Sequence, residues 1–188
     1  MRIDPITFLG SLEAWRKGEL ARPQHLLAEQ PRWRKRAREE FHYDVLVWSL
    51  MMGEYGFAEA LLDAGAQVSA RNRGRLTALH FAADRRDRRA LLLLLAKGAD
   101  ASQGLVYAVQ CWDMPMIDLF LEAGANRKVV TEETVSLFRV HGQVLRHLAD
   151  VGVELPKGIV DMLDKRVALG DDGRTAIPDP RPWRGEET

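Results

Sequence analysis

The chain has 188 residues, enough for one domain with a sizeable hydrophobic core, and its 27 Lys and Arg residues balance its 27 Asp and Glu residues. Zero net charge excludes a global attraction to nucleic acid or anionic lipid, so any such attraction must be local. The single cysteine excludes an internal disulfide, and MRIDPITFLG lacks the basic start and apolar core of a secretory signal, so a cytoplasmic protein is expected.

Residues 1–40 are predicted to form an N-terminal helical cap or a cryptic repeat. Around Gly18, the small residue Ala14 comes four positions earlier and the large apolar residue Leu26 comes eight positions later. The same spacing recurs further along the chain, so this segment fits the frame of the repeats that follow it.

The stretch PRWRKRAREEF, residues 31–41, is strongly basic. Its cations are Arg32, Arg34, Lys35, Arg36 and Arg38. A nuclear-localisation or nucleic-acid site, with Trp33 as a stacking partner, is one interpretation. A solvated helix face is favoured, because acidic residues and good helix formers accompany the bases.

Residues 41–155 contain four copies of one pattern, whose ends are the similar phrases LLDAGAQ, AKGAD, LFLEAGAN and LADVGVE. These phrases align Gly65, Gly98, Gly124 and Gly152. Glycine is a common C-cap because it enters the left-handed conformation without steric cost, so each of these glycines is predicted to end a helix.

The position twelve residues before each glycine is taken as the origin of its unit, which gives Gly53, Arg86, Trp112 and Val140. Apolar residues stand five, eight and nine positions after the origins, and small residues stand four positions before them. Residues at plus five and plus eight share one helix face. Each unit is therefore predicted to be a helix, a turn and a second helix, with Leu61, Leu94, Phe120 and Leu148 buried.

Between Gly65 and Thr77 there is room for a projecting hairpin, VSARNRGRL, with Asn72 and Gly74 as turn residues. Arg71, Arg73 and Arg75 alternate along it, so in an extended arm their side chains would point to one side. A second basic site is expected at the turn of the same unit, where Arg85, Arg86, Arg88 and Arg89 lie. The later units are too closely spaced for such a hairpin.

TALHFAA, residues 77–83, followed by LLLLLAKGAD, resembles an ankyrin repeat. The resemblance implies an all-α solenoid of stacked helix-turn-helix units, with one full β-hairpin finger and shortened later loops. It also implies that Thr77 caps a first helix, that His80 bonds neighbouring backbone, and that the protein binds protein partners without catalysis. Ala78 stands where the family usually has proline, and Arg86 where glycine is common.

Residues 156–170 are predicted to form a C-terminal capping helix, because apolar residues recur there at helical spacing: Ile159, Met162, Leu163 and Val167. Residues 171–188 are polar and proline-rich, which predicts an extended tail that is ordered only if Trp183 finds a groove.

The sequence contains no motif that indicates catalysis, metal binding or phosphate binding. The five histidines, His25, His42, His80, His141 and His147, lack the spacing and neighbours of metal ligands. Cys111 has no identified base and is expected to be a buried, inert thiol. Glycine-rich phosphate loops are absent from the sequence. No catalytic residue, cofactor or metal is therefore expected.

The sequence favours a module that binds one acidic protein partner at Arg71, Arg73 and Arg75, with Trp48 or Tyr107 adding apolar contact. Its sharper form is a dedicated inhibitor, such as a bacterial immunity protein that neutralises a cognate toxin. Binding through the acidic C-terminal half instead stays open. The alternative function is a nucleic-acid or anionic-surface binder that uses the basic segments Arg32 to Arg38 and Arg71 to Arg75.

Overall fold

The structure is a computed structural model that describes residues 5–18, 45–71, 75–137, 142–161 and 182–184. Across these residues the chain is mainly α-helical and no residue lies in a β-strand, which confirms the all-α class. None of the helices in these ranges is long and apolar enough to cross a membrane. The chain divides into two compact units, Met1–Ala99 and Asp100–Thr188.

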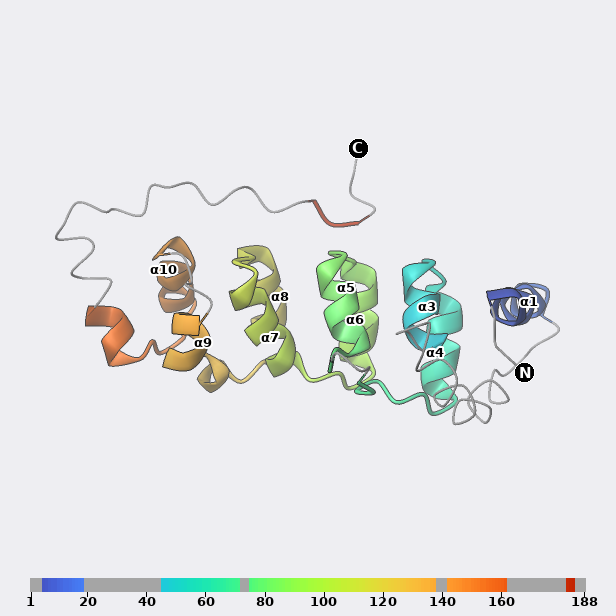
Figure 1. The fold of residues 1–188 in the computed structure, drawn as a ribbon, viewed down its shortest axis with the longest axis horizontal. Coiled ribbons are helices and arrows are strands. Elements are labelled where there is room, and N and C mark those ends of the chain that lie inside the picture. The colour runs from blue at the N-terminus through green and yellow to red at the C-terminus, as the bar shows by residue number, and fades with distance from the viewer. Residues whose placement is uncertain (1–4, 19–44, 72–74, 138–141, 162–181, 185–188) are drawn as a thin grey trace. The chain divides into compact units, whose positions relative to one another are not determined.

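The first unit contains two helix pairs. Helices α3 (Val45–Met51) and α4 (Tyr55–Asp63) form one pair, and α5 (Ala78–Asp84) and α6 (Arg88–Ala96) form the other (Figure 1). The first helices, α3 and α5, contact each other, and so do the second helices, α4 and α6. The two helix pairs therefore lie side by side in the same orientation. An N-terminal helix, α1 (Pro5–Arg16), completes the described part of this unit.

The second unit contains a third helix pair of the same kind, α7 (Ala101–Gln110) and α8 (Met114–Glu122). It continues with the 3-10 turn η1 (Arg127–Val129), α9 (Glu132–Leu137) and α10 (Gly142–Asp150). Helix α7 contacts both η1 and α9. Only residues 97–100 separate α6 from α7 in the sequence, so the loop predicted to be short at this point is short.

Helices α4, α6, α8 and α10, which correspond to the predicted second helices of the four repeats, end in the same way. Gly65, Gly98, Gly124 and Gly152 all have positive φ, with values of 98°, 87°, 84° and 80°. After α6, the Gly98 N–H donates to the Leu95 carbonyl at 3.0 Å and the Ala99 N–H donates to the Leu94 carbonyl at 2.9 Å. This is the Schellman arrangement, in which a left-handed residue lets the chain satisfy the last helical carbonyls. The predicted helix ends are confirmed.

The turns between paired helices use the same arrangement, but not always with glycine. Gly53, Arg86 and Trp112 stand at the predicted origins and have φ values of 78°, 50° and 59°. At the second of these turns the Arg86 N–H donates to the Ala83 carbonyl and the Asp87 N–H to the Ala82 carbonyl, both at 2.9 Å. Arg86 is only 5% exposed, so the prediction that it adds to a basic surface is wrong. Its side chain is packed within the turn between α5 and α6 and is not part of the surface.

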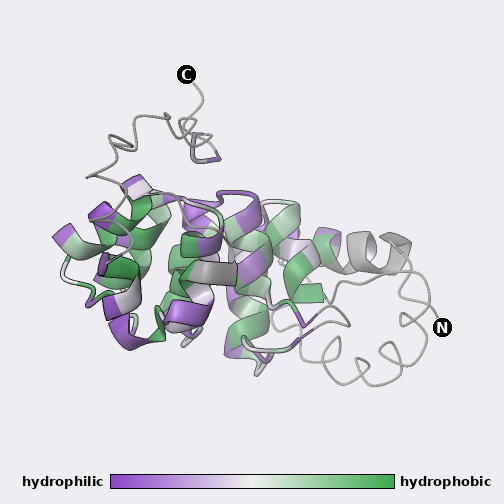
Figure 2. Ribbon diagram, turned by 60° about the vertical axis from the view of Figure 1, so that its left-hand side comes forward, coloured by the Kyte–Doolittle hydropathy of each residue, from purple (hydrophilic) through white to green (hydrophobic). Residues whose placement is uncertain are grey.

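The core follows the predicted frame closely. The residues five and eight positions after the four predicted repeat origins are described and fully buried, namely Ala58, Leu91, Ile117 and Leu145 at plus five and Leu61, Leu94, Phe120 and Leu148 at plus eight. At plus nine, burial declines from Leu62, which is buried, to Ala149, which is exposed. Hydrophobic and hydrophilic residues accordingly alternate along single helices in Figure 2. The buried face of each second helix is centred between the plus-five and plus-eight positions.

One close approach was not predicted. A Cβ atom added at Gly104 of α7 would lie 2.2 Å from the Cε1 atom of Phe120 on α8. Both residues are buried, so the ring occupies the space that a side chain at position 104 would need. Glycine at this position lets the bulky Phe120 fit where the other second helices carry leucine.

Helix α1 belongs to the core of the first unit. Leu12 is 1% exposed and packs with Val45, Phe57 and Leu61. The Trp15 ring lies 5.7 Å from the Phe57 ring, centroid to centroid. The basic segment at residues 31–41 and the other calls between residues 19 and 44 lie outside the described residues.

At the other end of the chain, residues 157–161 are helical and Ile159 is buried, as predicted for the capping helix. Met162, Leu163 and Val167 lie outside the described residues. Trp183 is buried, with 9% of its surface exposed. Apart from residues 182–184, the predicted tail is also outside the described part.

Candidate protein-binding site

The segment between α4 and α5 carries the predicted arginine finger. It begins with a turn at residues 68–69, where the Ala70 N–H donates to the Gln67 carbonyl at 3.1 Å. Arg71 and Arg75 are exposed, whereas Arg73 is among residues 72–74, which lie outside the described ranges. No described residue of this segment lies in a strand, so the predicted β-hairpin is not seen. Arg75 has a φ of 62°, which interrupts the extended alternation expected for the three arginines.

The segment ends in a capping box at the start of α5. Thr77 is the N-cap residue, and His80 Nδ1 accepts its backbone N–H at 3.1 Å. Thr77 Oγ1 lies 2.9 Å from the same nitrogen. Thr77 therefore caps the first helix and His80 bonds neighbouring backbone, as the sequence motif implied. Both roles are structural.

Arg71 is coupled electrostatically to this cap. Burial lowers the pKa of His80, and the Arg71 guanidinium lowers it further. Both effects favour the neutral ring, because a buried positive charge and a second positive charge nearby are each unfavourable. The neutral ring is also the form whose Nδ1 can accept the Thr77 N–H.

The two predicted apolar anchors lie in different units. Trp48, on α3, is half-buried and packs against the cluster that includes Leu12 and Phe57. Tyr107, on α7, is half-buried in the second unit. The structure therefore places Trp48 in the same unit as the arginines and Tyr107 in the other.

A polar network at the turn between α5 and α6 was missed by the sequence analysis. The Asp87 carboxylate caps α6 by accepting the Ala90 N–H at 2.9 Å, and it also accepts the Tyr55 hydroxyl at 2.9 Å. The Arg89 guanidinium lies over the Tyr55 ring, 4.5 Å from its centroid. An acid directly after the origin is the signal that could have revealed this cap, since Asp113 caps α8 in the same way by accepting the Met116 N–H at 3.1 Å.

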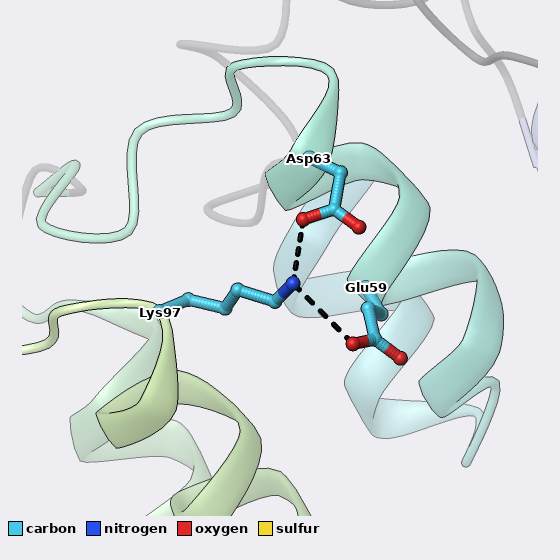
Figure 3. Close-up of polar contacts among 3 residues, drawn as sticks. All are labelled: Glu59, Asp63 and Lys97. Atoms are coloured by element: carbon cyan, nitrogen blue, oxygen red, sulfur yellow. Dashed lines mark hydrogen bonds and ion pairs between the residues drawn. The ribbon is translucent and has the colours of Figure 1, made fainter.

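Charged side chains also join neighbouring helix pairs. Lys97 Nζ, at the end of α6, contacts Asp63 Oδ1 at 2.5 Å and Glu59 Oε1 at 3.3 Å on α4 (Figure 3). The hydrogen bond to Asp63 raises the pKa of Lys97. In the second unit, His147 Nε2 on α10 lies 2.7 Å from Asp118 Oδ1 on α8. These contacts tie one second helix to the next.

Cys111 is exposed, so the prediction of a buried thiol is wrong. Its position explains the difference, because it is the C-cap of α7 and lies beyond the last turn of that helix. Within the described ranges, no group of three or more His, Cys, Asp or Glu residues could hold a metal ion.

No family model matches the chain. A search of curated proteins likewise finds no significant match. The resemblance to an ankyrin repeat therefore rests on the motifs TALHFAA and LLLLLAKGAD.

Proposed function

We propose that the chain is an ankyrin-type solenoid that binds one protein partner without catalysing a reaction, and that it acts as a dedicated inhibitor, as an immunity protein does toward its toxin. The observation that carries the proposal is the capping box of Thr77 and His80 within helix pairs that share one frame of turns and buried positions. A solenoid devotes its repeated residues to packing against neighbours, which leaves its variable loops and exposed helix faces for recognition.

The proposed interface is formed by Arg71, Arg73 and Arg75, with apolar contact from Trp48 or Tyr107. Its support is the exposure of Arg71 and Arg75, neither of which pairs with a carboxylate in the described residues. Guanidinium groups bind carboxylates through two parallel hydrogen bonds, so they suit an acidic protein surface and set its orientation.

The first experiment identifies the partner and tests inhibition. Proteins that co-purify with the chain from native lysate would be expressed alone, and their toxicity would be measured with and without an equimolar amount of this chain. We expect the activity of the partner to be abolished at a one-to-one ratio. A partner that stays fully active when saturated with the chain would rule out the inhibitor.

The second experiment tests the interface by replacing Arg71, Arg73 and Arg75 together with glutamate. We expect the melting temperature to stay within about 3 °C, because exposed substitutions rarely cost more than ~0.5 kcal/mol each. Affinity for the identified partner, measured by calorimetry, should fall at least about tenfold, mainly through slower association. Unchanged affinity of the folded variant would place the interface elsewhere.

Nucleic-acid binding is the alternative function that the same arginines favour. The salt dependence of the affinity distinguishes it from protein binding. Binding through five or more phosphate contacts should weaken roughly a hundredfold or more between 50 and 200 mM salt and show little sequence preference. Micromolar or tighter binding to duplex or single-stranded DNA at physiological salt would replace the protein-binding proposal.

A further inference from the structure

The start of α6 and the turn before it form a cationic surface with an apolar centre, called here the α6 face. It consists of Arg85, Arg88, Arg89 and Leu92, all exposed, and Leu92 is 50% exposed. Leu92 follows Arg88 by four residues and Arg89 by three, so it lies between the two arginines on the helix surface. A large apolar side chain is therefore presented to solvent with guanidinium groups beside it.

The shared frame of the helix pairs does not require arginines at the start of the second helix. Cations in the first turn of a helix oppose its dipole, which favours anions at that end. The corresponding positions of α8 are Met114 and Pro115, so the shared frame works without them. Among the described carboxylates, none forms an ion pair with Arg85, Arg88 or Arg89. The α6 face thus combines local repulsion with an exposed leucine.

One of the arginines is held in place before any partner arrives. The Tyr55 hydroxyl donates to Asp87 Oδ2 at 2.9 Å, which fixes the ring against the N-cap of α6. The Arg89 guanidinium rests 4.5 Å from the centroid of that ring. An immobilised guanidinium loses less conformational entropy on binding than a free one.

We propose that the α6 face docks an acidic segment of a protein partner, whose carboxylates pair with the arginines and whose apolar side chain covers Leu92. Charge complementarity selects the acidic residues. Leu92 selects a protein segment, because a phosphate backbone offers no apolar group to cover it. This surface is separate from the interface of the proposed function at Arg71, Arg73 and Arg75, and either can fail without the other.

The test is a selection of random 16-residue peptides displayed on phage, performed on the full-length protein. We expect enriched peptides to combine Asp or Glu with a large aliphatic residue. Their affinities would be measured by fluorescence anisotropy for the wild type, for Arg88→Glu/Arg89→Glu and for Leu92→Ala. The matched control is Arg127→Glu/Lys128→Glu, which reverses two exposed charges in η1.

We expect the arginine variant to bind the peptides at least about tenfold more weakly, Leu92→Ala about threefold more weakly, and the control within about twofold of the wild type. Circular dichroism should show all variants folded, because acids at a helix start are favourable and Leu92 is exposed. Equal binding to wild type and arginine variant, or the absence of acidic peptides among those enriched, would overturn the proposal. So would tighter, arginine-dependent binding of a 20-base-pair DNA duplex, or a dimer that the arginine variant abolishes.

Discussion

The helix pairs α5/α6 and α7/α8 share one backbone plan but fill it with different side chains. In both pairs the turn is left-handed, at Arg86 or Trp112, and an aspartate directly after it caps the second helix. At the buried plus-eight position the first pair carries Leu94 and the second Phe120. Eight positions before the origin, they carry Ala78 and Gly104 respectively.

The larger residue on the second helix thus accompanies the smaller residue on the first. The Phe120 ring occupies the space over Gly104, where a Cβ atom would lie 2.2 Å from it. The shared caps fix the path of the backbone, whereas side-chain volume can be redistributed between paired helices as long as the interior stays filled.

Truncating the buried plus-eight residue of either pair should destabilise the protein more than any other change proposed for these pairs. Leu94→Ala should lower the free energy of unfolding by roughly 2 to 5 kcal/mol and Phe120→Ala by roughly 3 to 5 kcal/mol, since both side chains are fully buried. Urea denaturation followed by circular dichroism measures both. A loss below about 0.5 kcal/mol for Leu94→Ala would contradict the assignment of the buried face.

The redistribution of volume is tested by Gly104→Ala. The added methyl group meets the buried Phe120 ring, so overpacking should cost about 1 to 3 kcal/mol even though alanine favours a helix. Combining it with Phe120→Leu, which recreates the pairing of Ala78 and Leu94, should cost less than the sum of the single changes.

The matched control for this cycle is Gly56→Ala in α4, where nothing lies within 4 Å of the new Cβ atom. It should stabilise the protein by about 0.4 to 1 kcal/mol by restricting the unfolded chain. Strict additivity of the two substitutions at positions 104 and 120 would show that these residues do not share one space.

The common caps are tested by Gly98→Ala. Its Cβ atom would meet nothing within 4 Å, so the expected loss of about 1 to 2 kcal/mol comes from the left-handed backbone alone. Chemical denaturation measures the loss. An unchanged or higher stability would mean that the chain ends α6 equally well without left-handed glycine.

The N-terminal caps of the two first helices, α5 and α7, should respond differently to pH. Helix α5 is capped through neutral His80, whereas in α7 Asp100 accepts the Ser102 N–H at 2.9 Å. The pKa of His80 is lowered in the folded state, so its contribution is complete above the unfolded value of about 6.5 and is lost as pH falls from there toward the folded value.

His80→Gln should remove this component, because glutamine can accept the same N–H but does not titrate. The measurement is the difference in unfolding free energy between wild type and variant across pH 5 to 8. We expect the wild type to lose more stability than the variant below pH 6.5. Parallel curves would show that His80 does not titrate differently on folding.

Much of this fold could be predicted from residues that recur. Gly65 and Gly98 mark helix ends because few other residues take positive φ easily, and Leu61 and Leu94 mark the core because their spacing matches the helical period. Thr77 and His80 could be assigned because a capping box is local in sequence.

The remainder depends on contacts that the sequence pattern does not contain. Arg86 is buried although its charge suggested a surface, and Cys111 is exposed although a buried, inert thiol was expected. The close approach of Gly104 to Phe120 joins residues on two helices, so no single periodicity reveals it. For the candidate site, the exposure of Arg71 and Arg75 could be predicted, but not the left-handed backbone at Arg75, because Gly74 suggested a regular hairpin turn.

The hydrogen bond from Tyr55 to Asp87 has a consequence for how the first unit opens. Asp87 caps α6, and the hydroxyl that supports this cap comes from α4, in the preceding helix pair. Fraying of the first turn of α4 therefore withdraws support from the start of α6, and amide protons in the two turns should exchange with solvent at related rates. Tyr55→Phe would uncouple them, so that the Ala90 amide exchanges faster while the amides at the far end of α6 keep their protection.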